Sequence, residues 1–247
     1  MNFMKKIIVL SFLMVFAHVL KAQPSYSLSA GVKLIKPDSR VTTLWYVDES
    51  PSMDNLYKSV EQEGNLAINL SARWQNDDAG KAFHLFVEGQ GYFGSINGLA
   101  LNTGLFYRKN FDSKFVVQPE LSAVLGFSSK GIGDIQNNDV YIQVNETQFQ
   151  DYTNVNVAIR NIYYGIKPGL NFIIKTGSFS EIGLGVHYQL SIKSGNVTFS
   201  GLGQDGYAAS DSEKLTEPNV GFYVDGDKTD KIPYNPDGLE LKIFYSF

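Results

Sequence analysis

Two histidines are the residues of this chain best suited to proton transfer, and a hydrolase would pair such a base with a nucleophile and an orienting acid. Ser191 follows His187 by four residues, and Glu88 and Glu120 are carboxylates that a fold could bring near. The second histidine is His84. The simpler interpretation is that both histidines are held by hydrogen bonds inside the fold, so we predict no catalytic residue and no enzymatic activity.

Metal, redox and nucleic-acid chemistry have little support. The 247 residues include no cysteine, which excludes disulfides, thiolate metal sites, a cysteine nucleophile and a lipid anchor on cysteine. Asp225, Asp227 and Asp230 could hold calcium, but their pattern lacks the glycine and distal glutamate of an EF-hand loop, and a solvated acidic loop is the alternative. We predict no metal and no cofactor. The net charge of −4 argues against a nucleic-acid partner.

The N-terminus has the form of a secretory leader. Lys5 and Lys6 precede an apolar run over residues 7–20, and Ala22 is a small residue suited to cleavage before Gln23. The run is shorter than the roughly 20 residues that a spanning helix needs. We therefore predict a cleaved signal peptide over residues 1–22 and one domain over 23–247. A retained N-terminal anchor is the alternative.

The dominant hydrophobic period beyond the leader is two, which predicts β-strands. In each candidate strand almost every second residue is apolar. The length of each candidate suits a strand that crosses a membrane, for which roughly 9–11 residues are needed. Eight segments show this pattern: 26–34, 66–74, 83–93, 99–107, 115–127, 162–174, 182–192 and 239–247.

The two alternating phases of these segments differ in chemistry. The apolar phase contains no charged residue, whereas the other is rich in Gly, Ser, Asn and Gln. A soluble sandwich or lipocalin-like barrel would need many Lys and Glu on its polar face, so we favour an apolar face toward lipid and a packed polar lumen. We expect the lumen network to be structural and to contain Lys33, Arg73, His84, Glu88, Arg108, Glu120, Lys167, His187, Glu240 and Lys242.

The connections between the segments alternate in length. Three connections on one side are long, and their residues 37–63, 129–160 and 194–238 carry formal charges of −4, −2 and −5. Outer-membrane barrels have short periplasmic turns and longer extracellular loops. Alternation returns at 140–144 and 155–159, which we expect to continue the fifth and sixth strands. Pro119 and Pro168 lie inside strands and predict a bulge or local break there.

Aromatic residues gather near both ends of the expected strands, as interfacial girdles would require. The alternative is that aromatic residues simply favour strands. The predicted membrane-interface residues are Tyr26, Trp74, Phe83, Phe93, Tyr107, Phe115, Phe127, Tyr164 and Phe172.

The last segment ends in Phe247, with Ile243 and Tyr245 on the same face. It resembles the C-terminal strand of bacterial outer-membrane barrels, which the barrel-assembly machinery reads as a signal for insertion. Residues 23–247 as a whole resemble eight-stranded barrels such as the OmpA transmembrane domain and OmpX. The leader end and the Gly- and Tyr-rich strands look like the PorT-like group of Bacteroidota outer-membrane barrels. The resemblance implies an all-β, up-and-down antiparallel transmembrane β-barrel in the outer membrane, and it carries over no catalytic residue.

Four functions remain open from the sequence. The first is a structural or surface-interaction role through the long acidic loops, without an open pore, because eight strands leave an interior that side chains fill. The others are an accessory part of a secretion or assembly machine, a lipid-modifying enzyme using His187, and a soluble periplasmic sandwich. The expected partners are outer-membrane lipid, the assembly machinery during biogenesis, and a protein or glycan that contacts the tyrosine-containing loops.

Overall fold

The computed structural model describes residues 24–35, 41–47, 55–59, 66–76, 82–136, 142–150, 153–177, 180–214, 217, 220–224, 227–229 and 236–247. The predicted signal peptide lies outside these ranges, as do Val140, Tyr141, Asp225 and Asp230. No helix in these ranges is long and apolar enough to cross a membrane.

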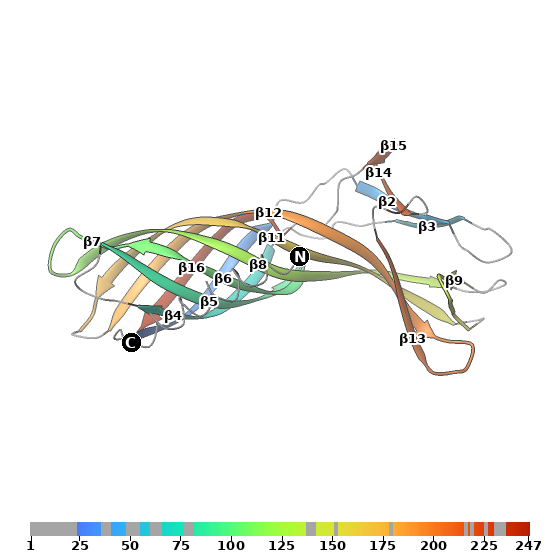
Figure 1. Ribbon diagram of the computed structural model, residues 1–247, viewed down its shortest axis with the longest axis horizontal. Helices are drawn as coiled ribbons and strands as arrows, with labels where there is room; N and C mark the ends of the chain where they lie inside the picture. Colours follow the sequence, from blue (N-terminus) through green and yellow to red (C-terminus); the bar gives the residue numbers. More distant parts are fainter. Residues whose placement is uncertain are drawn as a thin grey trace, which may run out of the picture.

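Eight antiparallel strands close into one barrel, which confirms the predicted fold class (Figure 1). Each strand pairs with its neighbours along the chain, and the first and last strands complete the ring. All eight predicted segments lie in these strands, except that Phe247 follows the last residue of β16. The barrel strands are β1 (Pro24–Ile35), β4 (Leu66–Asn76), β5 (Phe83–Gly94), β6 (Asn97–Tyr107), β8 (Phe115–Gln136), β11 (Asn154–Lys175), β12 (Glu181–Leu202) and β16 (Gly238–Ser246).

Three of the barrel strands continue well beyond the others toward the long-loop end, which is the end that carries the long connections. β8, β11 and β12 each have 22 residues and project together to the right in Figure 1. Residues 128–136, 154–161 and 193–202 of these strands, with β13 (Ala208–Lys214) paired to β12, form what we call the extension. The opposite end, where the connections are short, we call the short-turn end.

The apolar face of the chain reverses where the extension begins. In the barrel the apolar side chains point outward, and Ile162, Tyr164 and Ile166 of β11 are all exposed. Farther along the same strand Val157 and Ile159 point inward and are completely buried. Side chains alternate between the two faces along a strand. The apolar residues of β11 change from even-numbered positions in the barrel to odd-numbered positions in the extension, so the face reverses while the strand continues. The barrel is therefore apolar outside, and the extension is apolar inside.

The inner face of the extension forms a hydrophobic core over the mouth of the barrel. A short hairpin of β9 (Gln143–Val144) and β10 (Thr147–Gln148) lies on this face, and its Phe149 bridges to Gly203. The core is continuous with apolar residues at the barrel rim. We call it the cap cluster; it contains Ile35, Ala67, Tyr92, Ile96, Ala100, Val124, Ile142, Val144, Phe149, Val155, Val157, Ile159, Tyr163, Val197, Phe199 and Val220.

The expected continuation of the fifth strand was partly wrong. Residues 131–135 of β8, not 140–144, pair with residues 155–158 of β11, whereas Gln143–Val144 pairs with β10. The sixth strand does continue through 155–159 as expected. The physical reason is that β8 runs without interruption past Phe127 to Gln136, so the later alternation is left for the hairpin.

Two long connections that are far apart in sequence form a second sheet. Its strands are β2 (Val41–Val47), β3 (Asn55–Ser59), β14 (Val220–Val224) and β15 (Asp227–Thr229), in the order β15-β14-β2-β3. The sequence had indicated only polar loops here.

Both strand prolines are accommodated by local breaks, one of the two predicted outcomes. Pairing of β11 with β12 stops at Ile166 and resumes at Gly169 in the same register, which leaves Pro168 without a partner on β12. On the edge of β8 that faces away from β11, pairing with β6 ends at Glu120. Pairing resumes at Val117 with the short β7 (Lys109–Asn110), so Pro119 lies in the gap between them. Each missing amide donor therefore lies where a ladder hydrogen bond is absent.

Candidate functional site: a charged network in the barrel lumen

The inward phase of the barrel strands gathers almost all of the charged residues that the sequence assigned to the lumen. Nine of the ten are buried, and Arg108 is partly buried at the short-turn end. Strand register places opposite charges side by side, as with Lys33 opposite Glu240 and Arg73 opposite Glu88. The side chains nevertheless reach across the lumen, so most of the ion pairs join strands that are not neighbours.

The centre of the network is a cluster of two carboxylates and two lysines. The Nζ of Lys242 donates to Oε2 of Glu88 at 2.7 Å. The Nζ of Lys167 lies 3.0 Å from Oε1 of Glu240 and 3.6 Å from Oε1 of Glu88. Gln90 connects the cluster, because it donates to Glu240 at 2.8 Å and accepts from Lys167 at 2.9 Å.

Glu120 is the centre of a second cluster. It accepts hydrogen bonds from Arg73 at 2.7 Å and from Asn171 at 2.8 Å through Oε2. Its Oε1 lies 2.8 Å from Nε2 of His187. The guanidinium of Arg73 also lies 3.7 Å from the ring centre of Phe86, a cation–π contact. One carboxylate thus holds three cationic or polar side chains in place, one each from β4, β11 and β12.

Toward the long-loop end, the network meets the cap cluster at Lys33. Its Nζ donates to Oε1 of Gln189 at 2.6 Å and lies 4.4 Å from the ring centre of Tyr92. Tyr92 also donates to Gln90 at 2.7 Å, so this one aromatic residue belongs to both the polar network and the apolar cap.

Two acidic residues complete the charge balance and were missed by the sequence analysis. At the short-turn end, Glu181 pairs with Arg108 at 2.5 Å. Asp237 accepts a short hydrogen bond from Ser191. Glu181 falls one residue before a predicted strand and continues its inward phase, whereas Asp237 falls two residues before another and is not in that strand's inward phase. With them, the network contains five basic and five acidic residues, so its formal charges are equal in number.

Glycines make room for two of the larger lumen side chains. A Cβ at Gly169 would lie 1.9 Å from Cδ2 of His187, its partner across the β11–β12 ladder. A Cβ at Gly183 would lie 2.1 Å from Cζ of Phe244, again a cross-strand partner. The glycines of these strands therefore permit a filled lumen, which is not apparent from sequence alone.

His187 and Ser191, the candidate base and nucleophile, have different hydrogen-bond partners among the described residues. His187 is buried against Glu120, while the hydroxyl of Ser191 donates to Asp237. His84 stacks on Phe106 at a ring-centre distance of 4.9 Å. The contact between His187 and Glu120 fits a structural role, in which the acid orients the imidazole.

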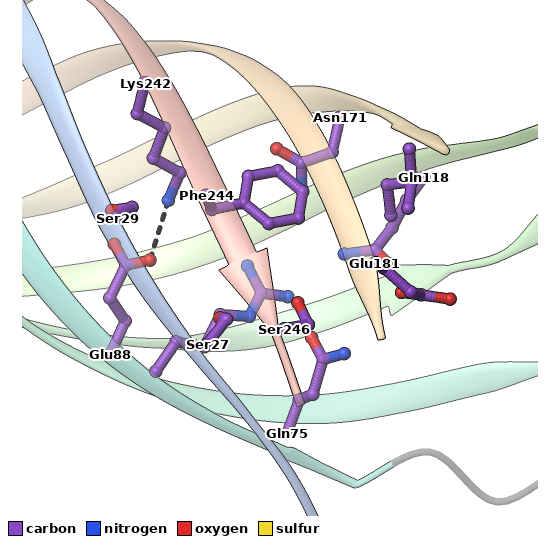
Figure 2. Close-up of a pocket in the computed structure, with 12 residues that line it drawn as sticks. Ser27, Ser29, Gln75, Glu88, Gln118, Asn171, Glu181, Lys242, Phe244 and Ser246 are labelled. Carbon is purple, nitrogen blue, oxygen red and sulfur yellow. Dashed lines mark hydrogen bonds and ion pairs between the residues drawn. The ribbon is translucent and has the colours of Figure 1, made fainter. Parts of the chain in front are cut away.

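A small cavity lies between the Glu120 cluster and the short-turn end (Figure 2). Its volume of about 10 Å³ has room for about one water molecule. Figure 2 shows Lys242 and Glu88 joined across it, with Phe244 and Asn171 on the same wall. Nε and Nη2 of Arg73, which also lines the cavity, have no hydrogen-bond partner among the described residues. The cavity is thus suited to water rather than to a substrate.

The predicted interface aromatics lie on the outer wall. Trp74 and Phe115 are partly exposed and the other seven are exposed. Phe93, Phe127 and Tyr164 are near the long-loop end, and the remainder are near the short-turn end, where Phe83 and Tyr107 are 6.0 Å apart. Ile243, Tyr245 and Phe247 are also exposed on β16. Phe247 exchanges two backbone hydrogen bonds with Tyr26, which ties the last strand to the first.

No protein-family model matches the chain, and no curated protein matches it. Among solved structures, a FadL homologue of Pseudomonas aeruginosa aligns at 7% identity and a TM-score of 0.17, covering 91% of this chain and 89% of that one. The COG4313 outer membrane channel of Pseudomonas putida F1 aligns at 9% identity and a TM-score of 0.15, covering 91% and 95%. With overlap this low, the assignment of the fold rests on the strand registers of this chain.

Removing the charge of Glu120 tests the network. Glu120→Gln leaves the positive charge of Arg73 buried without its carboxylate, and we expect the free energy of unfolding to fall by about 3–5 kcal/mol. The exposed Glu146→Gln makes the same chemical change and is expected to cost less than about 0.5 kcal/mol. Equilibrium unfolding in urea measures both, and equal effects would contradict the network.

The glycine beside His187 gives a second test. We expect Gly169→Ala to lower the free energy of unfolding by about 1–3 kcal/mol, because the added methyl group displaces the imidazole. In a His187→Ala background that penalty should nearly vanish, since the clash is gone. Gly89→Ala, with nothing within 4 Å of the added Cβ, is the control. A penalty that persists without His187 would show that the backbone, not the imidazole, rejects the methyl group.

Proposed function

We propose that the chain is an integral outer-membrane β-barrel with a sealed lumen, and that it acts as a structural or surface-interaction protein through the extension and long connections. The observation that carries this proposal is the exposed apolar outer wall. Every barrel strand contributes to it, and Leu28, Leu70, Leu101, Leu125 and Leu184 are each about half exposed. An apolar surface that encircles the molecule is far larger than a soluble monomer exposes.

The height of the wall supports a membrane as its environment. The outward apolar positions of β8 run from Phe115 to Phe127, and at about 3.3 Å per residue and a tilt of about 40° they rise about 30 Å. The hydrocarbon core of a bilayer is about 30 Å thick. Beyond this height the outward residues of the same strand become Ser129 and Gly131, although the strand continues. The change in chemistry supports a membrane boundary at that point.

The packing of the lumen supports a role without a pore. Its charged side chains are paired across the barrel, and the cap cluster covers the long-loop end with apolar side chains. A permeating ion would have to separate several buried ion pairs and enter that apolar core. Interaction with a partner therefore belongs outside the lumen, where the connections are acidic and where Tyr207 at the tip of the β12–β13 turn is 76% exposed.

An arginine placed on the outer wall tests the membrane assignment. Ile166→Arg puts a cation at the middle of the proposed bilayer and should lower stability by about 2–4 kcal/mol, with loss of the SDS-resistant, heat-modifiable band. Asn156→Arg changes the same face of β11 beyond the proposed boundary, and we expect it to keep the band. The measurement is a gel of boiled and unboiled membrane fractions. Wild-type protein released by osmotic shock without detergent would contradict the proposal.

The absence of a pore has its own test. We expect wild-type protein, refolded in planar bilayers and shown to be heat-modifiable in the same preparation, to give no discrete conductance steps. The reason is that side chains fill an eight-stranded barrel and the cap cluster excludes water. Reproducible steps from the purified protein would contradict the sealed lumen without contradicting membrane insertion.

A further inference from the structure

The outward face of the extension begins with a row of polar and basic residues. Register across β8, β11 and β12 aligns Phe127, Ile162 and Ser194 at the upper edge of the apolar wall. Two residues farther along the strands, away from the barrel and on the same face, the next row consists of Ser129, Arg160, Asn196 and Lys214, from four adjacent strands. We call these four residues the boundary row.

The boundary row is basic although the segments around it are acidic. Arg160 and Lys214 are exposed, and neither makes an ion pair with another described residue. Asp134, an acid on the same face, lies farther from the wall and accepts a hydrogen bond from Asn156 at 2.8 Å. The acidic residues of β13 lie on the opposite face of the strand from Lys214. On that face Asp211 accepts hydrogen bonds from Asn145 and Thr147 of the hairpin.

The geometry points to the boundary row as a binding site for the net-anionic, phosphate-bearing headgroup of a lipid in the outer leaflet. This inference rests on the proposed membrane function. The apolar wall immediately below would hold the acyl chains of the same lipid. Adjacent strands are about 4.8 Å apart, so the backbones of Arg160 and Lys214 are about 10 Å apart, and their long side chains can converge on one headgroup.

The chemistry of the row suits phosphate. The arginine fork offers paired donors that match two phosphate oxygens, and the lysine adds a flexible point charge. The amide of Asn196 and the hydroxyl of Ser129 add neutral hydrogen-bonding groups between and beside them. A basic residue near a membrane surface contributes about a fivefold preference for anionic lipid, which a row of two cations would increase.

A fluorophore beside the row provides a local test. The described residues hold no cysteine and neither does the rest of the sequence, so Ser194→Cys gives a single labelling site one row from the cations. The labelled protein is placed in phosphatidylcholine vesicles that contain a small fraction of spin-labelled lipid, with either a phosphatidylglycerol or a phosphatidylcholine headgroup. We expect the anionic quencher to act at least about threefold more effectively, and added salt to reduce this ratio.

The variant Arg160→Gln/Lys214→Gln should reduce the quenching ratio to about one. The matched control, Lys109→Gln/Lys175→Gln, removes two lysines at the short-turn end and should leave the ratio unchanged. Equal quenching by the two lipids in the wild type, or a ratio that survives in the Arg160 and Lys214 variant, would overturn the inference.

A second label separates this inference from the proposed function. Ile192→Cys lies in the apolar wall, and its fluorophore should be quenched by both spin-labelled lipids. If neither lipid quenches it, the wall is not in the membrane and the proposed function fails. If both lipids quench it while the Ser194→Cys label shows no headgroup preference, the membrane assignment stands and only the headgroup site is overturned.

Discussion

The structure depends on where its apolar side chains can be hidden. Within the barrel they point outward, and the membrane that we propose around the barrel would remove them from water. In the extension the same strands turn their apolar side chains inward, where Val157 and Phe199 are completely buried in the cap cluster. Closure of the barrel leaves no unpaired strand edge along the apolar outer wall. A chain that crosses lipid by strands requires such closure. The reversal of the apolar face thus explains both the closed barrel and the two-layered extension beyond it.

The polar lumen follows from the same constraint. The outward phase of the barrel strands is apolar, so their charged residues lie on the inward phase, where buried charges need partners. The clusters around Glu88 and Glu120 do so across the barrel, and Gly169 provides the space that His187 needs to reach Glu120. At the long-loop end the lumen gives way to the apolar cap cluster. The proposed function accordingly assigns contacts with partners to the outer face and the connections.

Much of this arrangement could be predicted from the sequence because period two is local. It identified all eight barrel strands, their outward faces and the lumen charges. It could not identify partners across the lumen: Arg73 contacts Glu120 rather than its register neighbour Glu88, since side-chain length decides this. Glu181 and Asp237 were missed because they precede the apolar runs. The sheet of β2, β3, β14 and β15 joins segments far apart in sequence, and no local pattern predicts such a pairing.

The most direct test of the reversal is a cysteine scan along β11, which the cysteine-free sequence allows. Single cysteines from Asn154 to Lys175 would be treated in intact membranes with a water-soluble, membrane-impermeant thiol reagent and with a lipid-soluble one. The account predicts that outward positions 162, 164 and 166 react only with the lipid-soluble reagent, whereas outward positions 154, 156 and 160 react with the water-soluble one. Reaction of position 166 with the water-soluble reagent would contradict a membrane around the barrel.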